Sequence, residues 1–376
     1  MLSRRALFGA SLPAAALALG FSPARAWARQ AALPFVRLTF NTDGVRRLLE
    51  LQAKKDGGDI AINSLLDLPA YKNVLRVGEA EGSLSRERLT ANARAVIEGT
   101  ATVRNQPRED AARLVIPDEM ICRDLLKRLD DSAPTRAARI AERIAEFSPD
   151  KVRKGEPVTQ TVYLHLGGTW DALNVGGDIF LNFHYWLEYN RPSLDGLNLV
   201  IAHETMHTVQ TKAYGNPESQ DDSMGAFVTA LSKIQREGTA RLVETETDAG
   251  PYGQYTYGFF YRAVSNEALR DFARLPRLLE LLHDACFPTF DKERFVAVYS
   301  QGMNDGGPFY ALGHAIAKAI DDRAGRPALL ATIEGGPKVF WSRYAELSRT
   351  APGLPRLPES VETRLRELPD RLPVAT

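Results

Sequence analysis

The stretch of sequence that decides the fold is residues 197–212, which read LNLVIAHETMHTVQTK. It carries an H-E-x-x-H motif at residues 203–207, and Glu204 is the only charged residue between positions 197 and 211. Apolar residues three and four positions apart predict a helix, with Ser193 as its N-cap and an end near Lys212. A helix without charged faces is typical of a buried position. We therefore expect the motif to lie on a helix inside the protein.

The spacing of the motif brings its two histidines together. Residues four apart on a helix lie one turn above each other, so the imidazoles of His203 and His207 point to one side and can hold one metal ion. Glu204 is rotated about 100° from His203, so it can address a water at the metal without binding the metal. The alternative is a helix with two partly buried histidines that bond to other groups. The pattern favours a zinc site with Glu204 as general base.

A catalytic zinc site takes three protein ligands and one water, so the motif needs a third ligand. The next predicted helix runs from about Ser223 to Glu246, and Glu237 continues its apolar face beside the small residue Gly238. Small residues allow another helix to approach closely. We predict Glu237 as the third ligand, the alternative being a solvated glutamate on a charged helix. Glu244 is the second candidate, either as a ligand or as an acceptor for a ligand imidazole N–H.

These motifs resemble those of the gluzincin clan of zinc peptidases, in which two histidines and one glutamate hold the metal. The resemblance rests on H-E-x-x-H followed by E-G-x-A at residues 237–240. A further segment, residues 308–317, is similar to the Y-x-x-G helix of membrane alanyl and glycyl aminopeptidases. That resemblance implies that Tyr310 donates a hydrogen bond to the oxyanion of the tetrahedral intermediate, and that His314, one turn further on, faces the same cleft. The alternative for both residues is a packing role in the core.

The resemblance covers roughly residues 160–345. The predicted strand at residues 176–183 resembles the edge strand on which such enzymes lay an extended peptide, and an ordinary core strand is the alternative. The G-x-M-E-N segment that fixes a free amino terminus in alanyl-type aminopeptidases is absent from the sequence. The resemblance therefore does not imply aminopeptidase specificity. As a whole the chain is similar to families of zinc-dependent peptidases without an assigned function.

The pattern along the chain is mainly helical. Apolar residues recur at intervals of three and four from about residue 43 to 150, and again from 192 to 352. Strand-forming residues occupy 159–166 and 178–183. We predict an α+β, mainly α fold with a helical N-terminal region at residues 29–157. The resemblance adds a zincin-like (gluzincin) catalytic core with a small β-sheet at residues 158–376.

Residues 1–28 have the pattern of a signal peptide. Ser3-Arg4-Arg5 precedes an apolar stretch from Leu7 to Phe21, and Ala24-Arg25-Ala26 has the A-x-A form of a cleavage site. The paired arginines resemble a bacterial twin-arginine signal, and a general secretory signal that contains two arginines is the alternative. Either signal predicts a periplasmic or secreted protein.

The composition indicates which classes of binding partner the protein has. The 47 basic and 47 acidic residues give a net charge of zero, whereas nucleic-acid-binding proteins carry a surplus of Lys and Arg. We expect no nucleic-acid partner and, because no later segment is long, apolar and uncharged, no stable membrane insertion. Cys122 and Cys286 either form one disulfide or remain two separate buried thiols.

These features predict a peptidase that binds one Zn²⁺ per chain and hydrolyses peptide bonds in a peptide or protein substrate. The predicted metal ligands are His203, His207 and Glu237, and the predicted catalytic residues are Glu204, Tyr310 and His314. Two other functions fit the same motif, a non-catalytic periplasmic zinc-binding protein and a hydrolase of cell-wall peptides. The intact Glu204 favours catalysis, because a zinc-binding protein does not need this carboxylate. The sequence makes no prediction of the oligomeric state.

Overall fold

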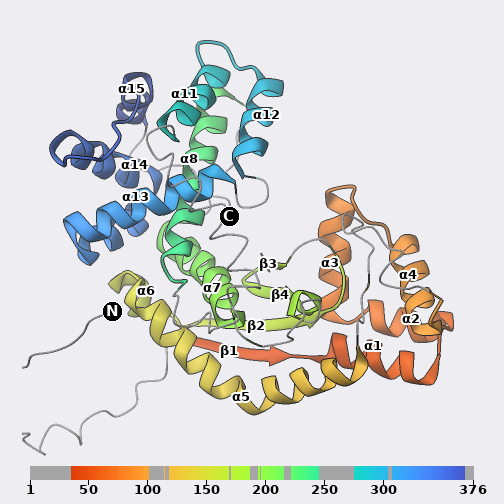
Figure 1. Ribbon diagram of the computed structural model, residues 1–376. Coiled ribbons are helices and arrows are strands. Elements are labelled where there is room, and N and C mark those ends of the chain that lie inside the picture. The colour runs from red at the N-terminus through yellow and green to blue at the C-terminus, as the bar shows by residue number, and fades with distance from the viewer. Residues whose placement is uncertain are drawn as a thin grey trace, which may run out of the picture. The chain divides into compact units, whose positions relative to one another are not determined.

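The structure is a computed structural model that describes residues 35–100, 114, 118–168, 171–186, 194, 196–215, 222–244, 275–303 and 307–368. The predicted signal peptide at residues 1–28 lies outside the described residues. Phe35–Thr376 form one compact unit, in which mainly helical elements surround one small sheet (Figure 1). The predicted α+β, mainly α class is therefore confirmed.

The N-terminal region is helical, as predicted, but it starts with a strand. Its elements are β1 (Val36–Asn41), α1 (Asp43–Lys54), α2 (Asp59–Leu66), α3 (Pro69–Ala80), α4 (Arg86–Glu98), α5 (Glu119–Glu146) and α6 (Asp150–Arg153). Side-chain caps fix the starts of two helices, because Ser85 accepts from the N–H of Arg88 and Asp118 accepts from the N–H of Ile121. β1, a six-residue strand in which one residue is buried, was not predicted from the sequence.

The sheet has four strands in the order β1-β2-β4-β3. Its other members are β2 (Val158–His165), β3 (Ala172–Val175) and β4 (Asp178–Asn182). β1 and β4 both pair with β2 in parallel, and β3 pairs with β4 antiparallel. The predicted strands at 159–166 and 178–183 correspond to β2 and β4. The division predicted between residues 157 and 158 remains a proposal about domain organisation, and the pairing of β1 with β2 crosses it.

The prediction of an edge strand at residues 176–183 is wrong. β4 has a partner on both sides, and the edge strand on that side of the sheet is β3. Gly176 and Gly177 form the two-residue turn between these strands, with φ of 63° and 93°. Two successive positive φ angles are the signature of a tight hairpin turn, and they favour glycine at both positions. The turn therefore begins β4 rather than belonging to it.

The second half of the chain is helical between its turns. Its described elements are the short 3₁₀ helix Phe183–Trp186, α7 (Leu197–Tyr214), α8 (Ser223–Arg241), α11 (Leu275–Cys286), α12 (Lys292–Met303), α13 (Pro308–Ala324), α14 (Arg326–Thr350) and α15 (Glu359–Glu367). α7 starts after Gly196, which occupies the N-cap position that we predicted for Ser193. α8 ends at Arg241 rather than near 246. α7 ends at Tyr214, before Gly215, and α13 begins at Pro308.

α7 lies at the centre of this arrangement, as its uncharged sequence predicts. It contacts α8, α14, α5 and the edge strand β3, and Figure 1 shows α5 along β1 at the opposite edge of the sheet. Arg136 on α5 donates to Asn198 on α7 over 2.9 Å. The N-terminal region thus packs directly against the helix that carries the motif.

α8 and α13 cross at two glycines. A Cβ atom added at Gly238 would lie 2.0 Å from the backbone carbon of Gly313, and one added at Gly313 would lie 2.1 Å from the carbonyl oxygen of Ile234. No side chain fits at such distances. The prediction that Gly238 lets another helix approach closely is confirmed, and the helix in question is α13.

Both cysteines are free and buried, and burial raises the pKa of each thiol to about 12. The sequence left open whether these cysteines form a disulfide or remain separate thiols, and in the structure they are separate thiols. Among the described helices, none combines the length and the apolar character that a membrane span requires.

Candidate metal centre

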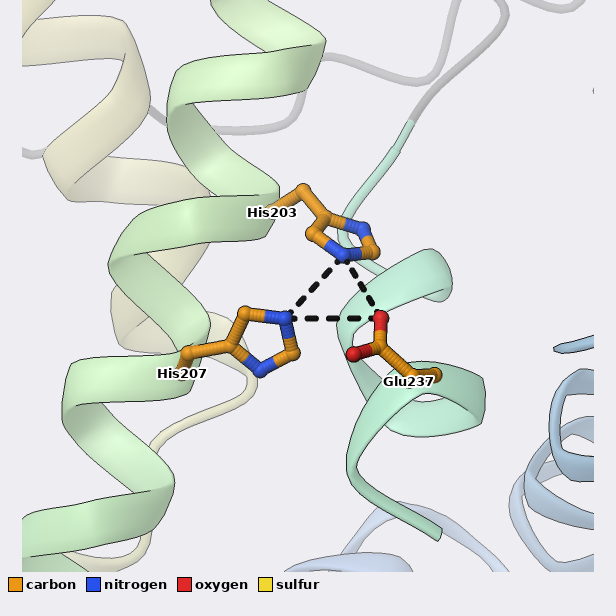
Figure 2. A group of neighbouring side chains, drawn as sticks. All are labelled: His203, His207 and Glu237. Atoms are coloured by element: carbon orange, nitrogen blue, oxygen red, sulfur yellow. Dashed lines mark hydrogen bonds and ion pairs between the residues drawn. The ribbon is translucent and has the colours of Figure 1, made fainter. Parts of the chain in front are cut away.

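Three side chains from two neighbouring helices converge at one point. His203 and His207 project from the same side of α7, and Glu237 projects toward them from α8 (Figure 2). The Nε2 atoms of the two histidines are 3.2 Å apart, and Oε2 of Glu237 lies 3.1 Å from His203 Nε2 and 3.5 Å from His207 Nε2. The structure thus brings together the three residues that the sequence nominated as ligands.

The spacing of these three atoms fits a zinc ion. Tetrahedral zinc has bonds of about 2.0–2.1 Å to imidazole nitrogen and carboxylate oxygen, so its ligand atoms are about 3.3 Å apart. The three measured separations of 3.1, 3.2 and 3.5 Å lie around this value. Two imidazoles and one carboxylate also leave the fourth position of a tetrahedron open, as a catalytic site requires.

Hydrogen bonds hold both histidines in the orientation that a metal needs. His203 donates from Nδ1 to Glu244 over 2.8 Å, and His207 donates from Nδ1 to Gln210 over 2.9 Å. Gln210 is itself fixed, because its Nε2 donates to the carbonyl oxygen of Arg236 and to the hydroxyl of Thr239. Both histidines therefore present Nε2 to the centre. Glu244 has the acceptor role that we gave as one of its two alternatives.

The electrostatics of the centre favour a cation. Burial lowers the pKa of His203, but Glu237 and Glu244 outweigh it and raise the pKa to about 10. Burial alone would raise the pKa of Glu237, yet Lys233 and His207 hold it well below the usual range. Lys233 lies one turn before Glu237 and contacts its other oxygen, Oε1, over 2.7 Å. One carboxylate oxygen is thus held by Lys233 and the other faces the histidines.

The N-terminal region contacts the segment that carries Glu244, on the far side of the metal centre's ligands in the sequence. Arg143 on α5 donates to the carbonyl oxygens of Leu242 and Val243, over 2.8 and 3.0 Å. These two residues form the turn that follows α8 and leads to Glu244. Because Glu244 holds His203, the guanidinium on α5 helps to fix a predicted metal ligand through two intermediate contacts.

A cavity of about 560 Å³ opens in front of the three ligands. Glu204 lines it, as expected for a residue that addresses a water at the metal. The edge strand β3 forms another wall, and Asn174 on that strand donates to the carbonyl oxygen of Glu204 and to the hydroxyl of Thr208, both over 2.8 Å. These bonds fix the edge strand against the motif helix.

The two residues nominated on α13 differ in position. Tyr310 lines the cavity, and the guanidinium of Arg241 lies over its ring, 5.1 Å from the centroid. His314 is not among the described residues that line the cavity. Burial, together with the nearby charge of Arg241, lowers the pKa of His314 to about 4. The geometry favours Tyr310 over His314 for contact with a substrate, and the catalytic role of each remains a prediction.

The structure adds residues that the sequence analysis did not nominate. Gln210 and Lys233 stand at helical spacing from their partners, three after His207 and four before Glu237, so this spacing was a usable signal. Asp171, at the start of β3, lines the cavity and had no such signal. Burial raises the pKa of Asp171 to about 7, with a further contribution from Glu204.

Two imidazoles and a carboxylate at this spacing, with one position open to a cavity, form a donor set of the kind that holds zinc. The chain belongs to the family described as "Putative zinc dependent peptidase (DUF5700)", whose model matches residues 62–352. No curated protein and no solved structure matches the chain. The family description agrees with the donor set, and both indicate zinc as the metal.

Proposed function

We propose that this chain is an exported zinc-dependent peptidase that hydrolyses peptide bonds in a peptide or protein substrate. The observation that carries the proposal is the convergence of His203, His207 and Glu237 within 3.5 Å of one another, beside a cavity that Glu204 lines. The family to which the chain belongs supports the same reaction class. One Zn²⁺ per chain fits the single group of three ligands found among the described residues.

The residues of the cavity suit the parts of this reaction. When bound, zinc polarises the scissile carbonyl and lowers the pKa of a water toward 7. Glu204 takes the proton from the attacking water and passes it to the leaving amine. Tyr310 donates its hydroxyl hydrogen to the oxyanion that forms. We assign this contact to Tyr310 rather than to His314, because His314, one turn further along α13, is not among the described residues that line the cavity.

An extended peptide fits along β3. This strand pairs with β4 on one side, and its residues 172–174 line the cavity. An unpaired strand edge beside a catalytic site offers backbone hydrogen bonds to a substrate in extended form. The sheet with its antiparallel edge strand, followed by α7 and α8, supports a zincin-like core of the gluzincin type. In this proposal residues 158–376 form the catalytic part and residues 29–157 form a supporting helical region.

Export rests on the sequence of residues 1–28. We propose a periplasmic or secreted location, reached through a signal of the twin-arginine type. Mass spectrometry of the protein from periplasm or medium tests this, with cleavage expected after Ala26 or Ala28. An intact N-terminus on a cytoplasmic protein contradicts it.

The variant Glu204→Gln tests the proposed mechanism. It keeps the shape of the side chain and all three metal ligands but removes the base, so we expect a normal zinc content and loss of nearly all turnover. Glu142→Gln, at an exposed position on α5, is the matched control and keeps full activity. Peptide libraries and cell-wall fragments serve as substrates, each with and without a chelator.

The outcomes separate the three candidate functions. Chelator-sensitive cleavage of ordinary peptides that Glu204→Gln abolishes supports the proposal. Cleavage confined to cell-wall peptides supports the second hydrolase alternative. Tight zinc binding without hydrolysis of any substrate supports the non-catalytic zinc-binding protein, and turnover that persists in Glu204→Gln excludes Glu204 as the base.

A further inference from the structure

Two carboxylates that contact the predicted metal ligands or belong to them, Glu237 and Glu244, have a charged partner. Glu237 contacts Lys233 over 2.7 Å and His203 over 3.1 Å. Glu244 contacts His203 over 2.8 Å. The carboxylate of Asp171, in contrast, accepts from the backbone N–H of Ala172 over 2.7 Å. Among the described residues no lysine or arginine forms an ion pair with it. Carboxylates withdrawn from water normally have a cationic partner, so the charge of Asp171 is left for something else to complete.

The position of Asp171 indicates where such a partner would come from. The residue is half-buried and lines the same cavity as Glu204 and the metal ligands. It immediately precedes β3, the strand whose edge faces that cavity. A chain laid along β3 therefore passes or ends beside this carboxylate.

Among the described residues, the two cations that line the cavity already have other partners, so neither pairs with Asp171. Lys233 and Arg236 also line the cavity. Lys233 is paired with Glu237. The guanidinium of Arg236 is fixed by the carbonyl oxygens of His207 and Gly215, over 3.1 and 3.3 Å. Both cations are thus held on α8, and the carboxylate at the start of β3 remains open to a ligand.

We propose that Asp171 is the recognition site for a positively charged group of the substrate, a primary ammonium or guanidinium that enters the cavity beside the scissile bond. This inference rests on the proposed peptidase function, because it assigns the specificity of the same cavity. Two sources supply such a group, the free amino terminus of a peptide or a lysine or arginine side chain. Both offer N–H donors and a positive charge to a carboxylate that has no ion pair among the described residues, and such charge-assisted hydrogen bonds are stronger than neutral ones.

The test measures binding separately from cleavage. The full chain, loaded with zinc and carrying Glu204→Gln to prevent turnover, is titrated by calorimetry with hexapeptide amides built from alanine and one phenylalanine. The first pair of peptides differs only in a free or acetylated amino terminus. The second set is acetylated throughout and compares lysine with the uncharged norleucine at each interior position in turn.

The expected result is a preference of at least about tenfold for the charged member of one pair, as hydrogen bonds to charged groups typically give. Adding Asp171→Asn reduces that preference to about twofold or less and leaves the affinity for the uncharged peptide as it was. Asparagine keeps an oxygen that can accept from the N–H of Ala172, so a purely structural role of Asp171 predicts no change in the preference. Asp178→Asn is the matched control. Asp178, at the start of β4, also accepts a backbone N–H, that of Thr161 over 2.7 Å, but it does not line the cavity.

The arms of the experiment decide among the outcomes. Preference in the first pair identifies the amino terminus as the charged group, and preference in the second set identifies a basic side chain. Equal binding of charged and uncharged peptides to the chain with Asp171 intact overturns the inference, and this measurement does not depend on the folding of any Asp171 variant. A preference that survives in Asp171→Asn also overturns it. If the active chain cleaves peptides but shows no preference for charged ones, the proposed function stands and the inference fails. If charged peptides bind preferentially but no peptide is cleaved, the inference stands and the proposed function fails.

Discussion

The close crossing of α8 and α13 makes Gly238 the most sensitive neighbour of the metal centre. In Gly238→Ala the new Cβ atom would lie 2.0 Å from the backbone carbon of Gly313 and 2.4 Å from its Cα and carbonyl oxygen. Non-bonded carbon atoms prefer about 3.5 Å or more, so the two helices must move apart by about 1.5 Å. None of these three contacts is with a flexible side chain that can turn away.

Two opposing effects determine how much Gly238→Ala changes the free energy of unfolding. Alanine favours a helix over glycine by about 1 kcal/mol, whereas overpacking a close contact costs about 1–3 kcal/mol and sometimes more. Because the whole contact is backbone, we expect the steric cost to exceed this range. The free energy of unfolding of the metal-free protein should fall by about 2 kcal/mol or more, measured by urea denaturation.

The same displacement affects zinc binding. Glu237 directly precedes Gly238, and metal sites tolerate changes of about 0.2 Å in ligand distance. We expect at least a tenfold loss of zinc affinity, measured by competition with a chromophoric chelator. Gly58→Ala is the control, because its Cβ would meet at nearest the side-chain oxygen of Asp56 at 3.3 Å. If Gly238→Ala matches the control in both stability and zinc affinity, the helix crossing does not set the position of Glu237.

Three further predictions follow from the centre and its surroundings. Removal of zinc with a chelator should lower the free energy of unfolding by about 2.7 kcal/mol relative to protein at a free zinc concentration of 100 times Kd, and an unchanged melting temperature would contradict specific binding to the folded chain. Gln210→Ala should weaken zinc binding about 10- to 100-fold, because His207 loses the acceptor that orients its ring, and chelator competition at constant pH measures this. Asp171→Asn should stabilise the metal-free protein above neutral pH. The native pKa of Asp171, about 7, is raised above its ordinary value of 3.8, so the folded state holds a proton that the unfolded state has lost, and the resulting cost grows as pH rises from about 4 and is complete above about 7. The gain in the variant should be up to about 4 kcal/mol at pH 8 and about 2 kcal/mol at pH 5.5, and urea denaturation showing an equal gain at both pH values would exclude this titration as the cause.

The sequence was most informative where the chemistry depends on local spacing. Four residues make one helical turn, so the positions of His203 and His207 could be predicted from the motif alone. Glu237 could be chosen because a carboxylate at the edge of an apolar face, beside a glycine, is unusual on a solvated helix.

Contacts between distant segments could not be predicted in this way. Arg143 reaches Val243 across 100 positions of sequence, and no local pattern connects them. Asp171 lies beside Glu204 only because β3 folds back on β4 through Gly176 and Gly177. β3 itself spans four residues, too few for the alternation that identifies a strand, and so the edge strand was assigned to its neighbour β4.

The hydrogen bonds from Arg143 to the turn before Glu244 predict that N-terminally truncated versions of the chain bind zinc less well. A fragment starting at residue 158 would contain every nominated ligand, yet it would lack the guanidinium that holds Leu242 and Val243 and the strand that flanks β2. Such a fragment would have a looser Glu244 and, through it, a looser His203. The shortest fragment that folds and binds zinc on its own should therefore begin at or before Val36, far upstream of the H-E-x-x-H motif.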